Sequence, residues 1–134
     1  MNDGAPFVLD ASALLALFHR EKGWEEVMGI LSGDDAAVYL GAVNYAEVVS
    51  KSFAHGKPPV IIAEAVRSLG IHIVDFDSIL AEQAGVLKQQ AIPWGLSLGD
   101  CACLVLSRRL GATAVTADMA WANMGNVFRI MFIR

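Results

Sequence analysis

Cysteine and histidine are scarce in this sequence. It has two cysteines, Cys101 and Cys103, and three scattered histidines, so neither a disulfide framework nor a zinc site of clustered thiols and imidazoles is expected. The two cysteines lie two residues apart in a predicted helix and therefore point away from each other, which argues against a bond between them. We expect both to pack as small apolar residues in a reducing compartment.

A long apolar run is also missing. No segment approaches the ~20 apolar residues that a membrane helix needs, and Asp3 stands where a secretory leader would carry basic residues. We therefore expect a cytoplasmic protein, and 134 residues suit one domain over residues 1–134. Because 55% of the residues are hydrophobic and only 18% are charged, we also expect a partner to cover part of the surface.

Positive charge is in deficit, since the formal net charge is -4. Proteins that bind nucleic acid usually neutralise phosphates with lysine and arginine. Four acids that could form one metal site, Asp10, Glu47, Asp100 and Asp118, account for all four negative charges of this net charge. Divalent cations bound there would attract phosphate, so the net charge does not exclude an RNA substrate. Basic residues that could contact an RNA backbone, or simply be solvated at helix ends, are Arg20, Lys22, Lys51, Lys57, Arg108 and Arg109.

Short apolar strands alternate with helical segments along the chain. The pattern predicts strands at residues 8–9, 36–40, 71–74, 113–116 and 127–133. It predicts helices at 12–20, 24–31, 43–54, 58–69, 78–90 and 98–110, with a loop at 91–95 and a short helical turn at 118–121. This alternation indicates the α/β class: one domain with a mostly parallel five-stranded sheet and helices on both faces.

Each of the four acids has an ordinary structural explanation. Asp10 and Asp118 could cap the helical segments that follow them. Asp100 lies three residues after a serine, as in a capping box. Glu47 precedes Lys51 by four residues, the spacing of a surface ion pair on a helix.

Taken together, the acids predict a shared site. Asp10 and Asp118 each follow an apolar strand, Glu47 and Asp100 lie in the first turns of apolar helices, and a parallel sheet brings such positions to the edge where ligands bind. Glu47 has apolar neighbours, so its carboxylate needs a partner. Carboxylates without thiolates or imidazoles suit Mg²⁺ or Mn²⁺, and a pair of such ions could activate water for in-line displacement at a phosphodiester.

Two hydroxyls and two tryptophans lie beside these acids. The hydroxyls of Ser12 and Thr116 could hydrogen-bond a metal-ligating carboxylate, a metal-bound water or a scissile phosphate, although satisfying nearby backbone amides explains them equally well. Trp94 and Trp121 could stack on a base. Packing in the core is the simpler interpretation of both.

The segments around the acids resemble the four acidic motifs of the PIN-domain family, closest to the VapC-type ribonuclease toxins of bacterial toxin–antitoxin pairs. In the family's order, from Phe7 to about Ile133, the segments are Leu9-Asp10-Ala11-Ser12-Ala13-Leu14, Asn44-Tyr45-Ala46-Glu47-Val48, Leu96-Ser97-Leu98-Gly99-Asp100-Cys101 and Val115-Thr116-Ala117-Asp118-Met119-Ala120-Trp121. The resemblance implies a five-stranded parallel sheet and a Mg²⁺- or Mn²⁺-dependent endoribonuclease.

The resemblance also implies the site residues and the partners. Asp10, Glu47, Asp100 and Asp118 would bind metal, and Ser12 and Thr116 match the hydroxyl positions of the first and last motifs. A homodimer is implied, inhibited by a small antitoxin whose C-terminal segment docks near the active site. The apolar helices at 24–31 and 43–53 could frame its groove. Some relatives carry a further acid where this chain has Asn123, so a second metal would be held mainly by substrate.

Two other functions stay open. An aspartyl phosphatase or phosphotransferase would use Asp10 as its nucleophile, but the usual second aspartate two residues later is Ser12 here. A non-catalytic PIN-like module that binds RNA or protein would keep the acids for structure. Loss of RNA cleavage in a folded Asp100→Asn variant would separate catalysis from these alternatives.

Overall fold

The computed structural model describes residues 4–134. Asp3, on which the expectation of no secretory leader depends, lies outside them. The strands are β1 (Phe7–Leu9), β2 (Val38–Gly41), β3 (His72–Val74), β4 (Thr113–Thr116) and β5 (Ile130–Phe132). The helices are α1 (Ala11–His19), α2 (Trp24–Ser32), α3 (Ala42–Ala54), α4 (Pro59–Ser68), α5 (Ser78–Gln90) and α6 (Leu98–Arg109), with the short 3₁₀ helices η1 (Ile92–Trp94) and η2 (Met119–Met124).

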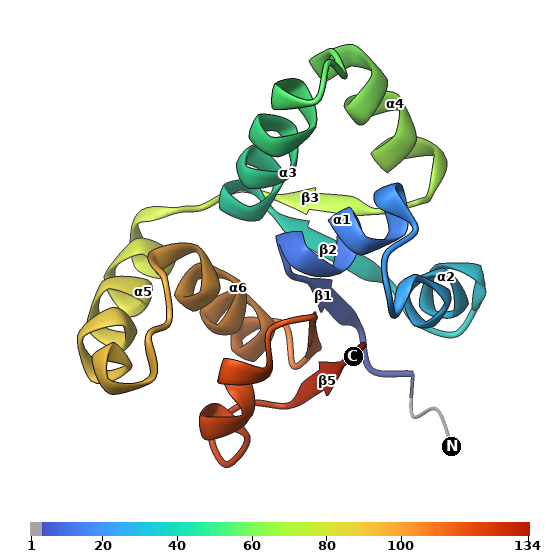
Figure 1. Cartoon of the computed structure of the whole chain (residues 1–134). Coiled ribbons are helices and arrows are strands. Elements are labelled where there is room, and N and C mark those ends of the chain that lie inside the picture. Colours follow the sequence, from blue (N-terminus) through green and yellow to red (C-terminus); the bar gives the residue numbers. More distant parts are fainter. Residues whose placement is uncertain (1–3) are drawn as a thin grey trace.

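The strands form one five-stranded sheet in the order β3-β2-β1-β4-β5. All four neighbouring pairs are parallel, which confirms the predicted sheet. Figure 1 shows β3, β2 and β1 side by side in this order. The chain leaves β1 toward β2 on one side and later returns to β4 on the other side. In open α/β sheets, ligands bind at the carboxyl ends of the strands where the order reverses in this way. The fold therefore directs attention to the carboxyl ends of β1 and β4.

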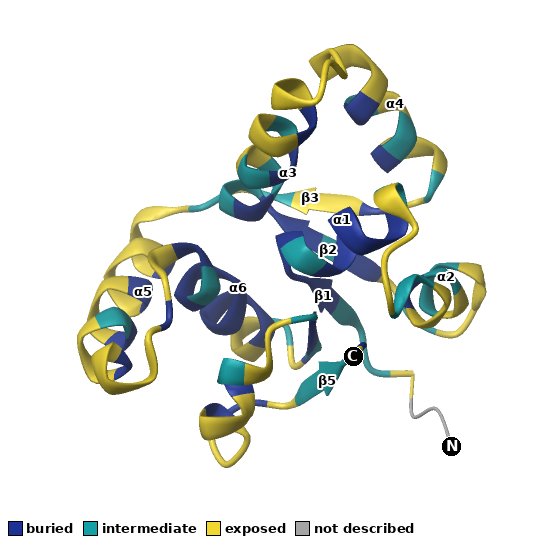
Figure 2. Cartoon of the chain, viewed as in Figure 1, coloured by how far each residue is buried: buried dark blue, intermediate teal, exposed yellow. Residues whose placement is uncertain are grey.

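Helices cover both faces of the sheet, as predicted, and each face has its own apolar core. One core includes residues of α5, α6 and η2, and the other includes residues of α1 to α4. Val8 and Leu9 are fully buried and face opposite cores, so β1 lies at the centre of the molecule. Figure 2 shows β1, β2 and much of α6 buried, with exposed outer faces on α4 and α5.

Two helices begin at residues whose side chains cap them, and the cap of α6 is the capping box that the sequence indicates. In α6, the Ser97 hydroxyl accepts from the Asp100 backbone N–H at 3.0 Å, and the Asp100 carboxylate accepts from the Ser97 N–H at 2.8 Å. In α5, the carboxylate of Asp77 accepts from the Leu80 N–H at 2.8 Å. These reciprocal bonds satisfy donors that have no partner within the helix.

Two boundaries differ from the prediction by three residues. The helical turn predicted at 118–121 extends to Met124 in η2. The last strand, predicted at 127–133, is formed only by Ile130–Phe132. The N–H groups of Val127 and Phe128 both donate to the Met124 carbonyl at 3.0 Å, which closes the turn after η2 instead of pairing with β4. The predicted loop at 91–95 contains the short helix η1.

Two further features concern the cysteines and the length of the apolar helices. Cys101 and Cys103 are both buried and free, as predicted. Within residues 4–134 no helix is both long and apolar enough to cross a bilayer.

Candidate functional site

Asp10 lies where β1 passes into α1, at the crevice between β1 and β4. Its backbone N–H donates to the Val115 carbonyl at 2.8 Å, which fixes the residue to the end of β4. It occupies the N-cap position of α1, but its side chain makes no capping bond. Instead its Oδ2 atom accepts from the Ser12 hydroxyl at 2.6 Å and the Thr116 hydroxyl at 3.1 Å. Capping therefore does not explain this carboxylate, which is only 5% exposed.

The hydroxyls of Ser12 and Thr116 connect the ends of the two central strands. Each donates to Asp10 and accepts from a backbone N–H, Ser12 from Ala117 at 3.0 Å and Thr116 from Asp118 at 3.0 Å. The two hydroxyl oxygens are 3.3 Å apart. The sequence left two roles open for these hydroxyls, bonding to backbone amides or to a carboxylate. In the structure each hydroxyl does both, because it accepts from a local amide and donates to Asp10.

The charges of Asp100 and Glu47 act on Asp10. Its pKa is raised from 3.8 to about 6, first by burial, while the Ser12 hydrogen bond opposes the shift and the charge of Asp100 adds to it. The Thr116 hydrogen bond also lowers the pKa, and the charge of Glu47 raises it. The charges of Asp100 and Glu47 thus act on Asp10 at the carboxyl edge of the sheet, which links three of the four predicted acids.

The charges of the same three acids also act on the thiol of Cys103, which lies in α6. Burial raises its pKa well above the usual range, and the charges of Asp10, Asp100 and Glu47 raise it further. The thiol is fully buried and belongs to the apolar core beneath the acids. The charges of three of the four predicted acids therefore act on the same buried thiol.

Glu47 is held by a residue that the sequence analysis did not single out. The Asn44 side-chain Nδ2 donates to Glu47 Oε1 at 2.9 Å and to the Gly99 carbonyl at 3.1 Å. Asn44 is fully buried, and its Oδ1 atom has no hydrogen-bond partner. The described residues include no ion pair between Glu47 and Lys51, so the surface-pair explanation has no support. A signal existed in the sequence, because a polar residue three positions before an acid can contact it on a helix.

The capping interpretation does hold for the other two acids. Asp100 completes the capping box of α6 and still acts electrostatically on Asp10. Asp118 is exposed, and its Oδ1 accepts from the Ala120 N–H at 2.9 Å at the start of η2. Its connection to the site is the Thr116 hydroxyl, to which its backbone N–H donates. Asp118 thus lies at the rim of the group formed by Asp10, Glu47 and Asp100, which we call the acid cluster.

The donor set fits a hard divalent cation in its chemistry. Asp10, Glu47 and Asp100 offer carboxylate oxygens only, which Mg²⁺ and Mn²⁺ prefer. Their mutual repulsion would be relieved by a cation. Across the described part of the chain, no three His, Cys, Asp or Glu side chains are already arranged to hold a metal ion. Binding would therefore require the carboxylates to adjust, above all Asp100, which is engaged at the helix cap.

Several candidate RNA contacts have local partners. The guanidinium of Arg109 forms a bidentate bond with Asp77, at 2.6 and 3.1 Å, which ties the end of α6 to the start of α5. Arg20 lies 4.2 Å from the ring centroid of Trp24, and Arg108 lies 5.2 Å from that of Phe128. Structural contacts thus account for these three arginines.

The tryptophans and Asn123 also have defined surroundings. Trp121 is fully buried, which confirms the packing interpretation, whereas Trp94 is 40% exposed. The side chain of Asn123 donates to the Ala120 carbonyl at 3.2 Å within the η2 turn. Asn123 therefore makes a local contact within the η2 turn.

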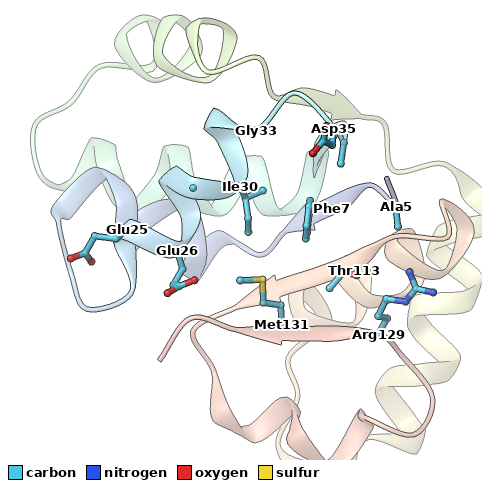
Figure 3. A pocket seen from close by; sticks show the side chains of 12 residues that line it. Ala5, Phe7, Glu25, Glu26, Ile30, Gly33, Asp35, Thr113, Arg129 and Met131 are labelled. Carbon is cyan, nitrogen blue, oxygen red and sulfur yellow. The ribbon is translucent and has the colours of Figure 1, made fainter. Parts of the chain in front are cut away.

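Figure 3 shows a cavity of about 490 Å³, and none of the four predicted site acids is among the residues that line it. Its lining includes Phe7 and Thr113, the first residues of β1 and β4, together with Met131 of β5. Because the strands are parallel, these first residues mark the edge of the sheet opposite to Asp10 and Thr116. This cavity is separate from the candidate site.

The parallel sheet and the acids at its crevice define an α/β domain with an acidic site between β1 and β4. The family model of the PIN domain matches residues 7–127. The chain therefore belongs to the PIN domain family, as the four acidic motifs predicted. A search of curated proteins finds no match.

Solved structures with a similar fold include toxin–antitoxin complexes. A toxin–antitoxin complex from Klebsiella pneumoniae matches with a TM-score of 0.72 and 14% identity, over 95% of this chain and 97% of that chain. VapBC-1 from nontypeable Haemophilus influenzae matches with a TM-score of 0.69, 14% identity and the same coverage. FitAcB from Neisseria gonorrhoeae gives a TM-score of 0.67 and 19% identity, again over 95% and 97%. At these identities the likeness shows the shared fold.

Proposed function

We propose that this chain is a Mg²⁺- or Mn²⁺-dependent endoribonuclease and the toxin of a type II toxin–antitoxin pair. One observation supports this most strongly: the buried carboxylate of Asp10 lies under the charges of Asp100 and Glu47 at the crevice of the sheet. Membership of the PIN family and the folds of the toxin–antitoxin neighbours agree with it. A neutral or cationic cluster at this edge would not have supported metal-dependent chemistry.

Each side chain has a part in the proposal. Asp10, Glu47 and Asp100 would hold the metal, with Asp118 at the rim. Ser12 and Thr116 would fix the Asp10 carboxylate through the two bonds to Oδ2. A bound divalent ion would supply an activated water and offset the negative charge that develops on the scissile phosphate.

The phosphatase alternative has less support. Ser12, which stands at the position of the usual second acid, donates to Asp10. A non-catalytic binding module is the second candidate, and it predicts no cleavage under any metal condition.

A homodimer and an antitoxin are the proposed partners. The large exposed apolar side chains of α3 to α6 and η1 give such partners surface to cover, and they are Phe53, Val60, Ile61, Ile79, Val86, Ile92, Trp94 and Leu98. Because α1 packs against both α2 and α3, an antitoxin segment between those two helices would lie over α1. Co-purification with the product of an adjacent short open reading frame would test this pairing.

The first experiment is cleavage of total cellular RNA by the purified chain, with EDTA, Mg²⁺ or Mn²⁺. We expect discrete metal-dependent products from the wild type and none from Asp10→Asn or Asp100→Asn. Glu82→Gln, which removes an exposed acid on α5, is the matched control and should cleave normally.

Two outcomes would count against the proposal. Equal cleavage by wild type and Asp100→Asn would contradict a catalytic role for the acid cluster. If the folded wild type cut no RNA with either metal, the binding-module alternative would replace the nuclease.

A further inference from the structure

Gly99 lies inside helix α6 without a conformational reason to be glycine. It is in the first turn of a regular helix, and it is not among the glycines with positive φ. Glycine in such a position lowers helix stability relative to alanine. A packing reason is therefore expected for it.

That reason is the carboxylate of Glu47. A Cβ atom built on Gly99 would lie 2.8 Å from both Oε1 and Oε2 of Glu47, closer than carbon and oxygen atoms tolerate. The absence of a side chain at Gly99 thus leaves the space that the carboxylate fills. Both carboxylate oxygens rest against the first turn of α6, one residue before Asp100.

Asn44 secures the same carboxylate from its own helix. Its buried Nδ2 group bridges Glu47 Oε1 and the Gly99 carbonyl, so one amide connects α3 to the first turn of α6. The bond to a carboxylate is charge-assisted and is stronger than a bond between neutral groups. Asn44 and Gly99 therefore restrain Glu47 by two independent means, a donor and a space.

We propose that Asn44 and Gly99 are positioning residues that seat the Glu47 carboxylate beside Asp100. This rests on the proposed metal-dependent function, in which both acids bind the ion. Neither Asn44 nor Gly99 is a ligand in this scheme. Residues that orient metal ligands typically change metal affinity about 10- to 100-fold when they are mutated.

Gly99→Ala is the sharpest test, because stability and site geometry should respond in different directions. The added methyl must displace the flexible end of Glu47, while the helix itself gains a better helix former. We expect a melting temperature equal to or above that of the wild type. We expect the dissociation constant for Mn²⁺, measured by electron paramagnetic resonance, to rise about 10- to 100-fold.

Gly85→Ala is the matched control. Gly85 lies inside α5, and a Cβ built there has no atom within 4 Å. It should raise the melting temperature without changing Mn²⁺ affinity. A purely structural role for Gly99 would give the same result as this control, and that result would overturn the proposal.

Asn44→Ala tests the donor. It should also weaken Mn²⁺ binding, and Ser52→Ala is its control, since Ser52 is a second buried polar residue on α3 whose hydroxyl has no partner. Equal Mn²⁺ affinity in the folded Asn44→Ala and Ser52→Ala variants would refute a role for the amide.

A metal-free measurement separates this inference from the proposed function. The ¹³Cδ chemical shift of Glu47 should change in Gly99→Ala and Asn44→Ala but not in Gly85→Ala or Ser52→Ala. Unchanged chemical shifts would refute the positioning of Glu47 by Asn44 and Gly99, even if the wild type is an active nuclease. Changed shifts in a protein that neither binds Mn²⁺ nor cuts RNA would refute the nuclease and the metal-positioning role with it, leaving only a structural contact.

Discussion

Asp10→Asn is expected to stabilise the metal-free protein while abolishing the proposed activity. The wild-type carboxylate is 5% exposed, and its pKa is raised from 3.8 to about 6, first by burial. Its ionised form is therefore less favourable in the folded state than in the unfolded state. Asparagine has nearly the same shape, and its Oδ1 can accept the bonds from Ser12 and Thr116 that now go to Oδ2.

The sign and size of this change in unfolding free energy follow from the linkage between protonation and folding. Because the folded pKa is raised, the group favours folding fully only below about pH 3.8, and that contribution is lost as the pH rises through about 6. Above pH 6 the ionised carboxylate costs about 3 kcal/mol relative to its protonated form. At pH 5 the cost is only about 1.5 kcal/mol, since the folded state still binds most of the proton.

The assay is urea unfolding in EDTA at pH 5 and pH 7.5, followed by circular dichroism. Asp10→Asn should exceed the wild type in unfolding free energy by up to about 1.5 kcal/mol at pH 5 and up to about 3 kcal/mol at pH 7.5. Glu82→Gln controls for removal of an exposed acid and should follow the wild type at both pH values.

The widening of the gap between the two pH values is the decisive feature. A variant that is less stable than the wild type at pH 7.5 would refute the cost assigned to the buried charge. A constant gap at both pH values would show that Asp10 does not titrate in this range, and the argument from burial would fail with it.

Three further predictions concern the surroundings of the site and the core. Thr116→Val should lower the unfolding free energy by about 1–2 kcal/mol in urea titrations, because the hydroxyl of this buried residue bonds both Asp10 and the Asp118 N–H. Arg109→Gln should lower the melting temperature at pH 7. The Arg109 bond holds the pKa of Asp77 at about 2, so the wild type should lose this stabilisation as the pH falls from 4 to 2 and the variant should not. Leu14→Ala should cost about 2–5 kcal/mol in chemical denaturation, because Leu14 is fully buried.

The fold was predictable because its signals are local. The boundaries of α6 follow from the capping box at Ser97 and the glycine after the helix, and both can be recognised within a few residues. The start of the last strand was predicted wrongly, because Val127 and Phe128 have strand-like side chains, yet their N–H groups donate to the Met124 carbonyl. Apolar composition alone could not reveal that turn.

The candidate site was only partly predictable. The four acids and the hydroxyls of Ser12 and Thr116 stand out in sequence because strand ends of a parallel sheet meet at one edge. The positioning of Glu47 by Asn44 and Gly99 does not stand out in the sequence. It depends on the approach of α3 to α6, which are more than 40 residues apart along the chain. The spacing of Asn44 and Glu47 indicates a contact within α3, but the role of Gly99 can be recognised only when that approach is known.

The buried charge of Asp10 is expected to lower the stability of the metal-free fold, and this bears on the purpose of the acid cluster. The ionised Asp10 costs about 3 kcal/mol above pH 6, and the buried Asn44 leaves its Oδ1 without a partner while its amide serves Glu47. Capping alone would require neither feature, because Asp100 and Asp118 cap their helices from partly or fully exposed positions. A bound cation would favour the ionised carboxylates and would stabilise the folded state in proportion to its affinity. Helix capping therefore does not account for the buried charge of Asp10, whereas the proposed cation would.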